Sequence, residues 1–233
     1  MKNIQQYFTK RTVLFIAIFA VVGFVALQIP VAQLAGSKAK FTLFDSFAPI
    51  TASFIGTIPG IFAVFAMQFF NFLLHGADIL DKGTIIRFFP ILFATLCFAR
   101  KSMVINVLVP ALAIIAFNLD PTGRTVWYYS LFWMIPILCY FIRDRFLLAR
   151  ALGATFTAHA VGGALWIHTF DIPATAWNAL IPIVTAERLL FAVGIAASYI
   201  LVNNLLHVLE QKRIIRLGFH IDQKYLFPWK LAS

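Results

Sequence analysis

A small set of polar and aromatic side chains lies within or at the ends of long apolar runs. Charged, imidazole and amide groups are costly in a lipid environment, so each one marks a candidate functional site. The candidate ligand-binding residues are Asp45, Asn71, His75, Arg87, His159, Trp166, Asn178, Glu187 and Arg188. Together they offer hydrogen bonds, charge pairing and aromatic walls, which are the chemistry of a pocket for a polar small molecule.

The two charges of Glu187 and Arg188 are adjacent in the sequence, so on a helix they point about 100° apart and do not face each other. We therefore expect each to have another partner. The candidates for Glu187 are Arg87 and His159. The candidates for Arg188 are Asp45 and a carboxylate of the ligand. Arg87 and Arg188 both lie inside apolar segments, which indicates an anionic group on that ligand.

Motifs for other chemistry are missing from the sequence. His159 and His168 are nine residues apart, on roughly opposite helix faces, and no HExxH or paired CxxC occurs, so we expect no metal site and no cofactor. A glycine-rich nucleotide loop and a GxSxG motif are also missing, so the chain is not expected to hydrolyse ATP or to be a serine hydrolase.

The composition predicts a polytopic membrane protein. Of 233 residues, 61% are apolar and only 12% are charged. A soluble protein of this length cannot bury so much apolar surface, and this excludes a soluble enzyme, a disordered chain, a nucleic-acid-binding module and a disulfide scaffold. The net charge of +10 fits basic cytoplasmic loops, and no nucleic-acid partner is expected.

The apolar runs predict an all-α bundle of about six to eight transmembrane helices, since they lack the alternation of strands. The candidate segments are 12–35, 42–57, 59–75, 84–98, 102–118, 126–142, 149–168 and 178–208. Pro59-Gly60 matches a type II turn between the second and third segments, and Asp120 to Gly123 matches a type I turn. The chain forms one domain, 1–233, and 209–233 is a basic amphipathic tail on the inner leaflet.

The basic residues set the orientation. With both termini in the cytoplasm, most of the 19 Lys and Arg residues fall inside, and only Lys38, Lys40, Lys82 and Arg124 fall in outer loops. Most of the costly polar groups then lie in the outer half of the bundle, which predicts an outward-facing pocket. Interfacial capping is the alternative for Asp45, His168 and Trp177.

A ridge of small residues, Ala48, Ala52 and Gly56, recurs every four residues. Small residues at this spacing let helix backbones approach closely in lipid. The ridge is either internal helix packing or a docking surface for another membrane subunit, and the sequence leaves both open.

Two stretches resemble a known family. The stretch from Phe41 to Gly60, FTLFDSFAPITASFIGTIPG, and the run AHAVGGALW from Ala158 to Trp166, followed by Glu187-Arg188, are similar to the substrate-binding (S) subunits of energy-coupling factor vitamin transporters. The resemblance implies a small helical protein of a bacterial or archaeal plasma membrane. It would bind a vitamin-like solute from outside and dock on a transmembrane coupling subunit that carries two ABC-type ATPases.

Two other functions remain open from the sequence. The polar groups could perform acid–base chemistry on a lipid or isoprenoid, as in an integral membrane enzyme. The chain could also be a self-contained ion-coupled carrier, although such carriers often show internal repeats and none is visible here.

Overall fold

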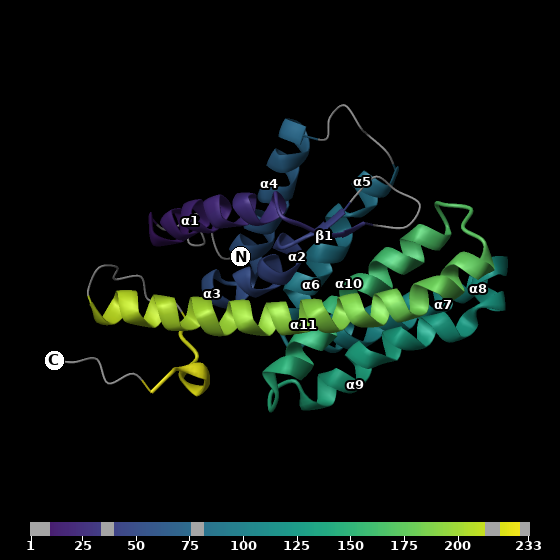
Figure 1. Ribbon diagram of the computed structural model, residues 1–233. Helices are drawn as coiled ribbons and strands as arrows, with labels where there is room; N and C mark the ends of the chain where they lie inside the picture. Colours follow the sequence, from purple (N-terminus) through teal and green to yellow (C-terminus); the bar gives the residue numbers. More distant parts are fainter. Residues whose placement is uncertain (1–9, 34–39, 76–81, 213–219, 229–233) are drawn as a thin grey trace, which may run out of the picture.

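The computed structural model describes residues 10–33, 40–75, 82–212 and 220–228 and is all-α apart from one short hairpin (Figure 1). The first half contains α1 (Lys10–Leu27), β1 (Pro30–Gln33), β2 (Lys40–Thr42), α2 (Phe44–Phe47), the 3-10 turn η2 (Ala48–Ile50), α3 (Thr51–Ile55), α4 (Thr57–His75), α5 (Lys82–Ile86) and α6 (Phe88–Ala99). The second half contains the π-helix η3 (Val104–Leu108), α7 (Val109–Leu119), α8 (Pro121–Thr125), the 3-10 helix η4 (Trp127–Trp133), α9 (Met134–Ile142), α10 (Leu147–Ile167), α11 (Ala174–Gln211) and the 3-10 turn η5 (Gln223–Tyr225).

Three helices in the described part are long and apolar enough to cross a membrane. They cover Thr57–Leu74, Lys82–Ala99 and Ala174–Gln211. Shorter apolar helices cover Val13–Leu27, Val104–Leu119 and Trp127–Ile142. Many large apolar side chains on these helices are exposed, as expected for surfaces that face lipid. These features indicate a membrane protein.

The first helix is shorter than the sequence predicted. We expected a helix over 12–35, but α1 ends at Leu27 and the chain then forms β1. Pro30 has no backbone N–H and disfavours a helical conformation at the residue before it, so the helix cannot continue. β1 pairs antiparallel with β2, with Pro30 opposite Thr42. The prediction of no strand is therefore wrong for this hairpin.

The break between the second and third predicted segments lies at Gly56, not at Pro59-Gly60. Gly56 has a φ of 94°, a left-handed conformation that glycine adopts without strain. Pro59 falls in the first turn of α4, where a missing N–H removes no intrahelical bond. The two segments are thus separate, as predicted, but the turn chemistry comes from a different residue.

The small-residue ridge packs inside the chain. Ala48 and Ala52 are 0% and 3% exposed, so neither offers a surface that a partner subunit can reach. A methyl group added at Gly60 would lie 2.4 Å from the Cα of Ala52, which shows how closely α3 and α4 approach. Only Gly56 of the ridge is exposed. The docking interpretation of this ridge is therefore replaced by internal helix packing.

The centre of the bundle is α10, which packs against α6, α7, α9 and α11 and has most of its side chains buried. Two hydrophobic clusters meet along it. One cluster contains residues of α1, α4, α6 and the second half of α11, and the other contains residues of α7, η4 and the first half of α11. Figure 1 shows α11 running the length of the molecule, past both groups of helices.

Two arginines cap the C-terminal end of α6. The Arg143 guanidinium donates to the backbone carbonyls of Cys97 at 2.6 Å and Phe98 at 2.9 Å. Arg150 adds a third bond, from Nε to the Phe98 carbonyl at 2.6 Å, and its guanidinium lies 4.1 Å from the centre of the Phe98 ring. The last carbonyls of a helix have no partner within it, and cations near this end are favourable. These side chains therefore terminate the helix and tie it to α10.

The tail folds back onto α11 over the described residues 220–228. The side chain of Asn203 exchanges two hydrogen bonds with the backbone of Asp222, at 2.9 and 2.8 Å. The side chain of Asn204 contacts the backbone of Tyr225 at 2.8 Å and of Phe227 at 2.7 Å. Lys224 Nζ donates to the backbone carbonyls of Asp144 and Arg145 in the α9–α10 loop. This part of the predicted lipid-surface tail is thus docked on protein.

We expect the double substitution Asn203→Ala with Asn204→Ala to loosen this tail, because it removes the four asparagine bonds to the tail backbone and leaves only those of Lys224 and Tyr199 among the bonds described for this segment. The rate of trypsin cleavage after Lys224 should increase at least about tenfold, since proteolysis follows the population of the undocked state. Gln211→Ala is the matched control, because Gln211 bonds to His207 and not to the tail. Equal cleavage of the double variant and the control would contradict this role.

Candidate functional site

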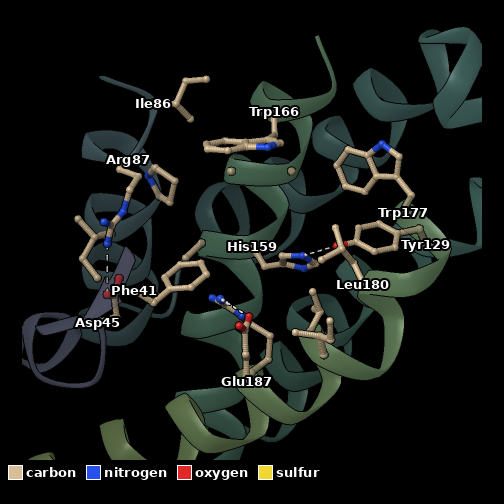
Figure 2. Close-up of a pocket in the computed structure, with 18 residues that line it drawn as sticks. Phe41, Asp45, Ile86, Arg87, Tyr129, His159, Trp166, Trp177, Leu180 and Glu187 are labelled. Atoms are coloured by element: carbon tan, nitrogen blue, oxygen red, sulfur yellow. Dashed lines mark hydrogen bonds and ion pairs between the residues drawn. The ribbon is translucent and has the colours of Figure 1, made fainter. Parts of the chain in front are cut away.

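A cavity of about 310 Å³ opens between β2, α5, α6, η4, α10 and α11. Its size is at the lower end of the range for small-molecule sites. The lining is mostly aromatic or apolar, with a few charged and polar groups directed inward (Figure 2). The predicted site residues among the lining are Asp45, Arg87, His159, Trp166, Glu187 and Arg188. The fold thus brings together residues from four separate regions of the chain.

The hairpin supplies one wall of the cavity. Asp45 lies in α2 just after β2, and its Oδ2 accepts a 2.8 Å bond from the backbone N–H of Thr42, which fixes the hairpin to the helix. The same oxygen lies 3.5 Å from Arg87. Phe41 of β2 then lies between two cations, with its ring centre 5.7 Å from the Arg87 guanidinium and 4.5 Å from that of Arg188. This ring therefore covers the charged side of the cavity.

Arg188 is buried but has no short hydrogen bond to any of the described residues. It is 4% exposed, yet its nearest polar contacts are Glu187 at 3.6 Å and the Thr155 hydroxyl at 3.5 Å. Its Nε has no hydrogen-bond partner among the described residues. Charge-assisted hydrogen bonds of arginine are normally about 2.7–2.9 Å long, so this guanidinium can still donate further hydrogen bonds.

The pairing of these charges differs from the prediction. Arg87 pairs with Asp45, and Arg188 pairs with its neighbour Glu187. Adjacent Cβ atoms do diverge on a helix, but the long side chains of Arg and Glu can curve back toward each other at their ends. The expected pairs of Glu187 with Arg87 or His159, and of Arg188 with Asp45, are therefore wrong.

His159 has both ring nitrogens engaged. Its Nδ1 lies 3.1 Å from Trp133 Nε1, and its Nε2 lies 3.1 Å from the Tyr129 hydroxyl. Trp133 is held in turn by its close approach to α10, since a methyl group at Gly163 would lie 2.6 Å from the indole. The imidazole is thus fixed in position by η4, at the edge of the cavity.

Aromatic residues that the sequence did not single out for binding complete the lining. Phe41, Tyr129 and Trp177 all face the cavity, and the rings of Tyr129 and Trp177 are 4.9 Å apart and nearly perpendicular. Trp177 is 2% exposed and its indole N–H has no acceptor among the described residues. In a chain with 26 Phe, 6 Tyr and 5 Trp residues, aromatic identity alone could not distinguish these rings from lipid-facing ones. The position of Trp177 beside Asn178 was the one available signal.

Two predicted site residues, Asn71 and Asn178, do not line the cavity. Asn71 of α4 accepts a 3.0 Å bond from Gln28 and joins the end of α1 to α4. Asn178 of α11 accepts a bond from the exposed Tyr128 hydroxyl. His75 is the last residue of α4, and its side chain lies outside the described part of the chain. Asn71 and Asn178 join helices instead.

Among the described residues, no group of three or more His, Cys, Asp or Glu side chains lies close enough together to hold a metal ion. No family model, no curated protein and no solved structure matches this chain, so its interpretation depends on the cavity itself.

Proposed function

We propose that this protein is the membrane-embedded solute-binding subunit of an energy-coupling-factor type transporter. It captures a small, vitamin-like anion from the outer face of a bacterial or archaeal plasma membrane. Partner subunits, a transmembrane coupling protein with ABC-type ATPases, then supply the energy for uptake. The chain is a polytopic bundle with both termini in the cytoplasm.

The observation that carries this proposal is the buried guanidinium of Arg188 on the cavity wall. A buried charge is costly unless it is paired and hydrogen-bonded, and among the described residues Arg188 has no polar contact shorter than 3.5 Å. An anionic ligand group in the cavity would supply the missing acceptors. A site that is incomplete without its ligand is suited to tight capture of that ligand.

The placement of the cavity supports capture from outside. With the N-terminus in the cytoplasm, the cavity-lining residues Arg87, Trp166 and Trp177 fall near the outer ends of their helices. Arg143 and Arg150 fall at the opposite ends, consistent with a basic cytoplasmic face. In this proposed orientation the cavity falls in the outer half of the bundle.

The state of His159 favours binding over acid–base catalysis. A general base needs a free nitrogen within reach of the substrate. Both nitrogens of His159 are directed to Trp133 and Tyr129. This argues for a positioned binding wall, and against the alternative of a membrane enzyme that uses His159 as its base.

The proposal is tested by purifying the tagged protein from its native membrane in mild detergent and identifying its partners by mass spectrometry. Recovery of a coupling membrane protein and ABC-type ATPases in comparable amounts is the expected result. Cells that lack the coupling protein should also lose uptake of the bound solute, which is extracted and identified from the purified protein. Uptake that persists without any ATPase would contradict the proposal and favour an ion-coupled carrier.

A further inference from the structure

One wall of the cavity is built from hydrogen-bond donors. It contains Tyr129, Trp177 and His159, and Trp133 lies behind His159. Figure 2 shows the rings of Tyr129 and Trp177 side by side, with His159 directed at the Tyr129 hydroxyl. The donors of this wall that matter for a ligand are those whose hydrogen has no acceptor among the described residues.

The protonation of His159 follows from its neighbours. An indole N–H can only donate, so Nδ1 of His159 must accept the bond from Trp133 and carries no hydrogen. A neutral imidazole has one N–H, which must then be on Nε2. That N–H donates to the hydroxyl oxygen of Tyr129, 3.1 Å away. His159 is thus a neutral donor, and Trp133 sets its tautomer.

The hydroxyl hydrogen of Tyr129 is consequently available. The hydroxyl oxygen accepts from His159, so its own hydrogen must point elsewhere, and no acceptor for it lies among the described residues. The indole N–H of Trp177, which is also buried and without an acceptor in the described part, lies on the same wall. The Tyr129 hydroxyl therefore has a hydrogen to donate beside the cavity, while the ring of Trp177 lines the same wall with its N–H buried.

We propose that this donor wall selects a ligand whose ring edge carries a hydrogen-bond acceptor, a carbonyl oxygen or an unprotonated ring nitrogen, and discriminates against a donor at that edge. This inference rests on the proposed ligand-binding function and names the chemistry of the ligand. An anionic group of the same ligand lies toward Arg188. Tyr129 and Trp177 contact the ligand, while His159 and Trp133 are positioning residues that act through Tyr129.

The discrimination has a physical cause. A ligand acceptor satisfies the Tyr129 hydroxyl hydrogen, which is otherwise unpaired among the described residues. A ligand N–H placed there can at best donate to the remaining lone pair of the Tyr129 oxygen, and it leaves that hydrogen unpaired. We expect the acceptor-bearing ligand to bind about tenfold more tightly than its donor-bearing counterpart.

The experiment uses three small ring acids that differ at one position. Isonicotinate has a ring nitrogen opposite its carboxylate, 4-aminobenzoate has a donor there, and benzoate has neither. Binding to the full-length protein in lipid nanodiscs is measured by titration calorimetry at neutral pH. The expected order of affinity is isonicotinate, then benzoate, then 4-aminobenzoate.

The substitution Tyr129→Phe should reduce this preference to less than about threefold, because it removes the hydroxyl while keeping the ring. Tyr128→Phe is the matched control. It removes the neighbouring hydroxyl, which bonds to Asn178 outside the cavity, and should leave the preference unchanged. Equal affinities in the wild type, a preference that survives Tyr129→Phe, or no binding of any of the three acids would each overturn the proposal.

A second readout needs no ligand. Nitrogen-15 NMR of histidine-labelled protein distinguishes a protonated ring nitrogen from an unprotonated one, and the His159 signals are assigned by their loss in His159→Gln. We expect a hydrogen on Nε2 only, and a mixture of tautomers in Trp133→Phe. A hydrogen on Nδ1 in the wild type would overturn the inference. These results are obtained on the isolated chain, so they are independent of whether coupling partners are recovered.

Discussion

The substitution Arg188→Met is expected to weaken ligand binding by about 100-fold without lowering the stability of the ligand-free protein. Charge-assisted hydrogen bonds to a buried guanidinium contribute up to about 3 kcal/mol, which corresponds to that factor. The same guanidinium is buried, and in the described part of the chain it has no polar contact shorter than 3.5 Å. Removing it removes this desolvation cost, which offsets the loss of its 3.6 Å pair with Glu187, a side chain that is 15% exposed and keeps contact with water. The flexible Met side chain can still pack against Phe41 and Phe191.

Two measurements separate binding from folding here. Affinity for isonicotinate is measured by calorimetry, and the unfolding temperature is measured in the same detergent without ligand. Arg188→Lys keeps the charge but loses the planar fork of donors, so its affinity should fall between those of the wild type and Arg188→Met. A drop of many degrees in the unfolding temperature of ligand-free Arg188→Met would show that Arg188 is structural.

The substitution Arg143→Met is expected to have the opposite pattern, with a loss of about 2–4 kcal/mol in stability and little change in affinity. Arg143 is as buried as Arg188, but it has two short bonds, to the carbonyls of Cys97 and Phe98. Removing it leaves the Cys97 carbonyl without this partner, at about 1–3 kcal/mol, and breaks a charge-assisted bond to the Phe98 carbonyl, which keeps its bond from Arg150. The unfolding temperature should fall by about 5–10 °C.

Arg145→Met is the control for this loss, because Arg145 lies in the same loop but is exposed. It should change the free energy of unfolding by less than about 0.5 kcal/mol. If Arg143→Met and Arg145→Met were equally stable, the capping of α6 by Arg143 would contribute nothing. The comparison of Arg188 with Arg143 thus distinguishes a ligand-binding arginine from a structural one in a single chain.

The sequence predicted the helical segments better than the breaks between them. Length and apolar character determine the segments, and seven of the eight predicted ranges correspond closely to helices or to consecutive helical elements. The breaks depend on single residues. Pro30 ends α1 early, and Gly56 makes the turn that the sequence placed at Pro59-Gly60, because a proline in the first turn of a helix is as favourable as one in a loop.

The cavity was predictable in its charges but not in its shape. Charged groups in apolar segments are rare, so Arg87, Glu187 and Arg188 could be singled out by type alone. Their partners could not be predicted, because the charged ends of these side chains lie several bonds from the backbone and can reach more than one neighbour. The donor wall was also beyond the sequence, since it depends on which faces of η4, α10 and α11 meet. Tyr129 and Trp177 come together only through that packing.

The length of α11 has a mechanical consequence. Its 38 residues span about 57 Å, which is nearly twice the hydrocarbon thickness of a bilayer. A single continuous helix therefore contains both Arg188 and the asparagines that hold the tail. The helix contains one proline, Pro182, and none between Arg188 and Asn203. Any displacement of α11 that draws Arg188 toward a bound anion must move Asn203 and Asn204 with it. The tail is also bound through Lys224 to the α9–α10 loop, so this movement strains the contacts between the tail and that loop.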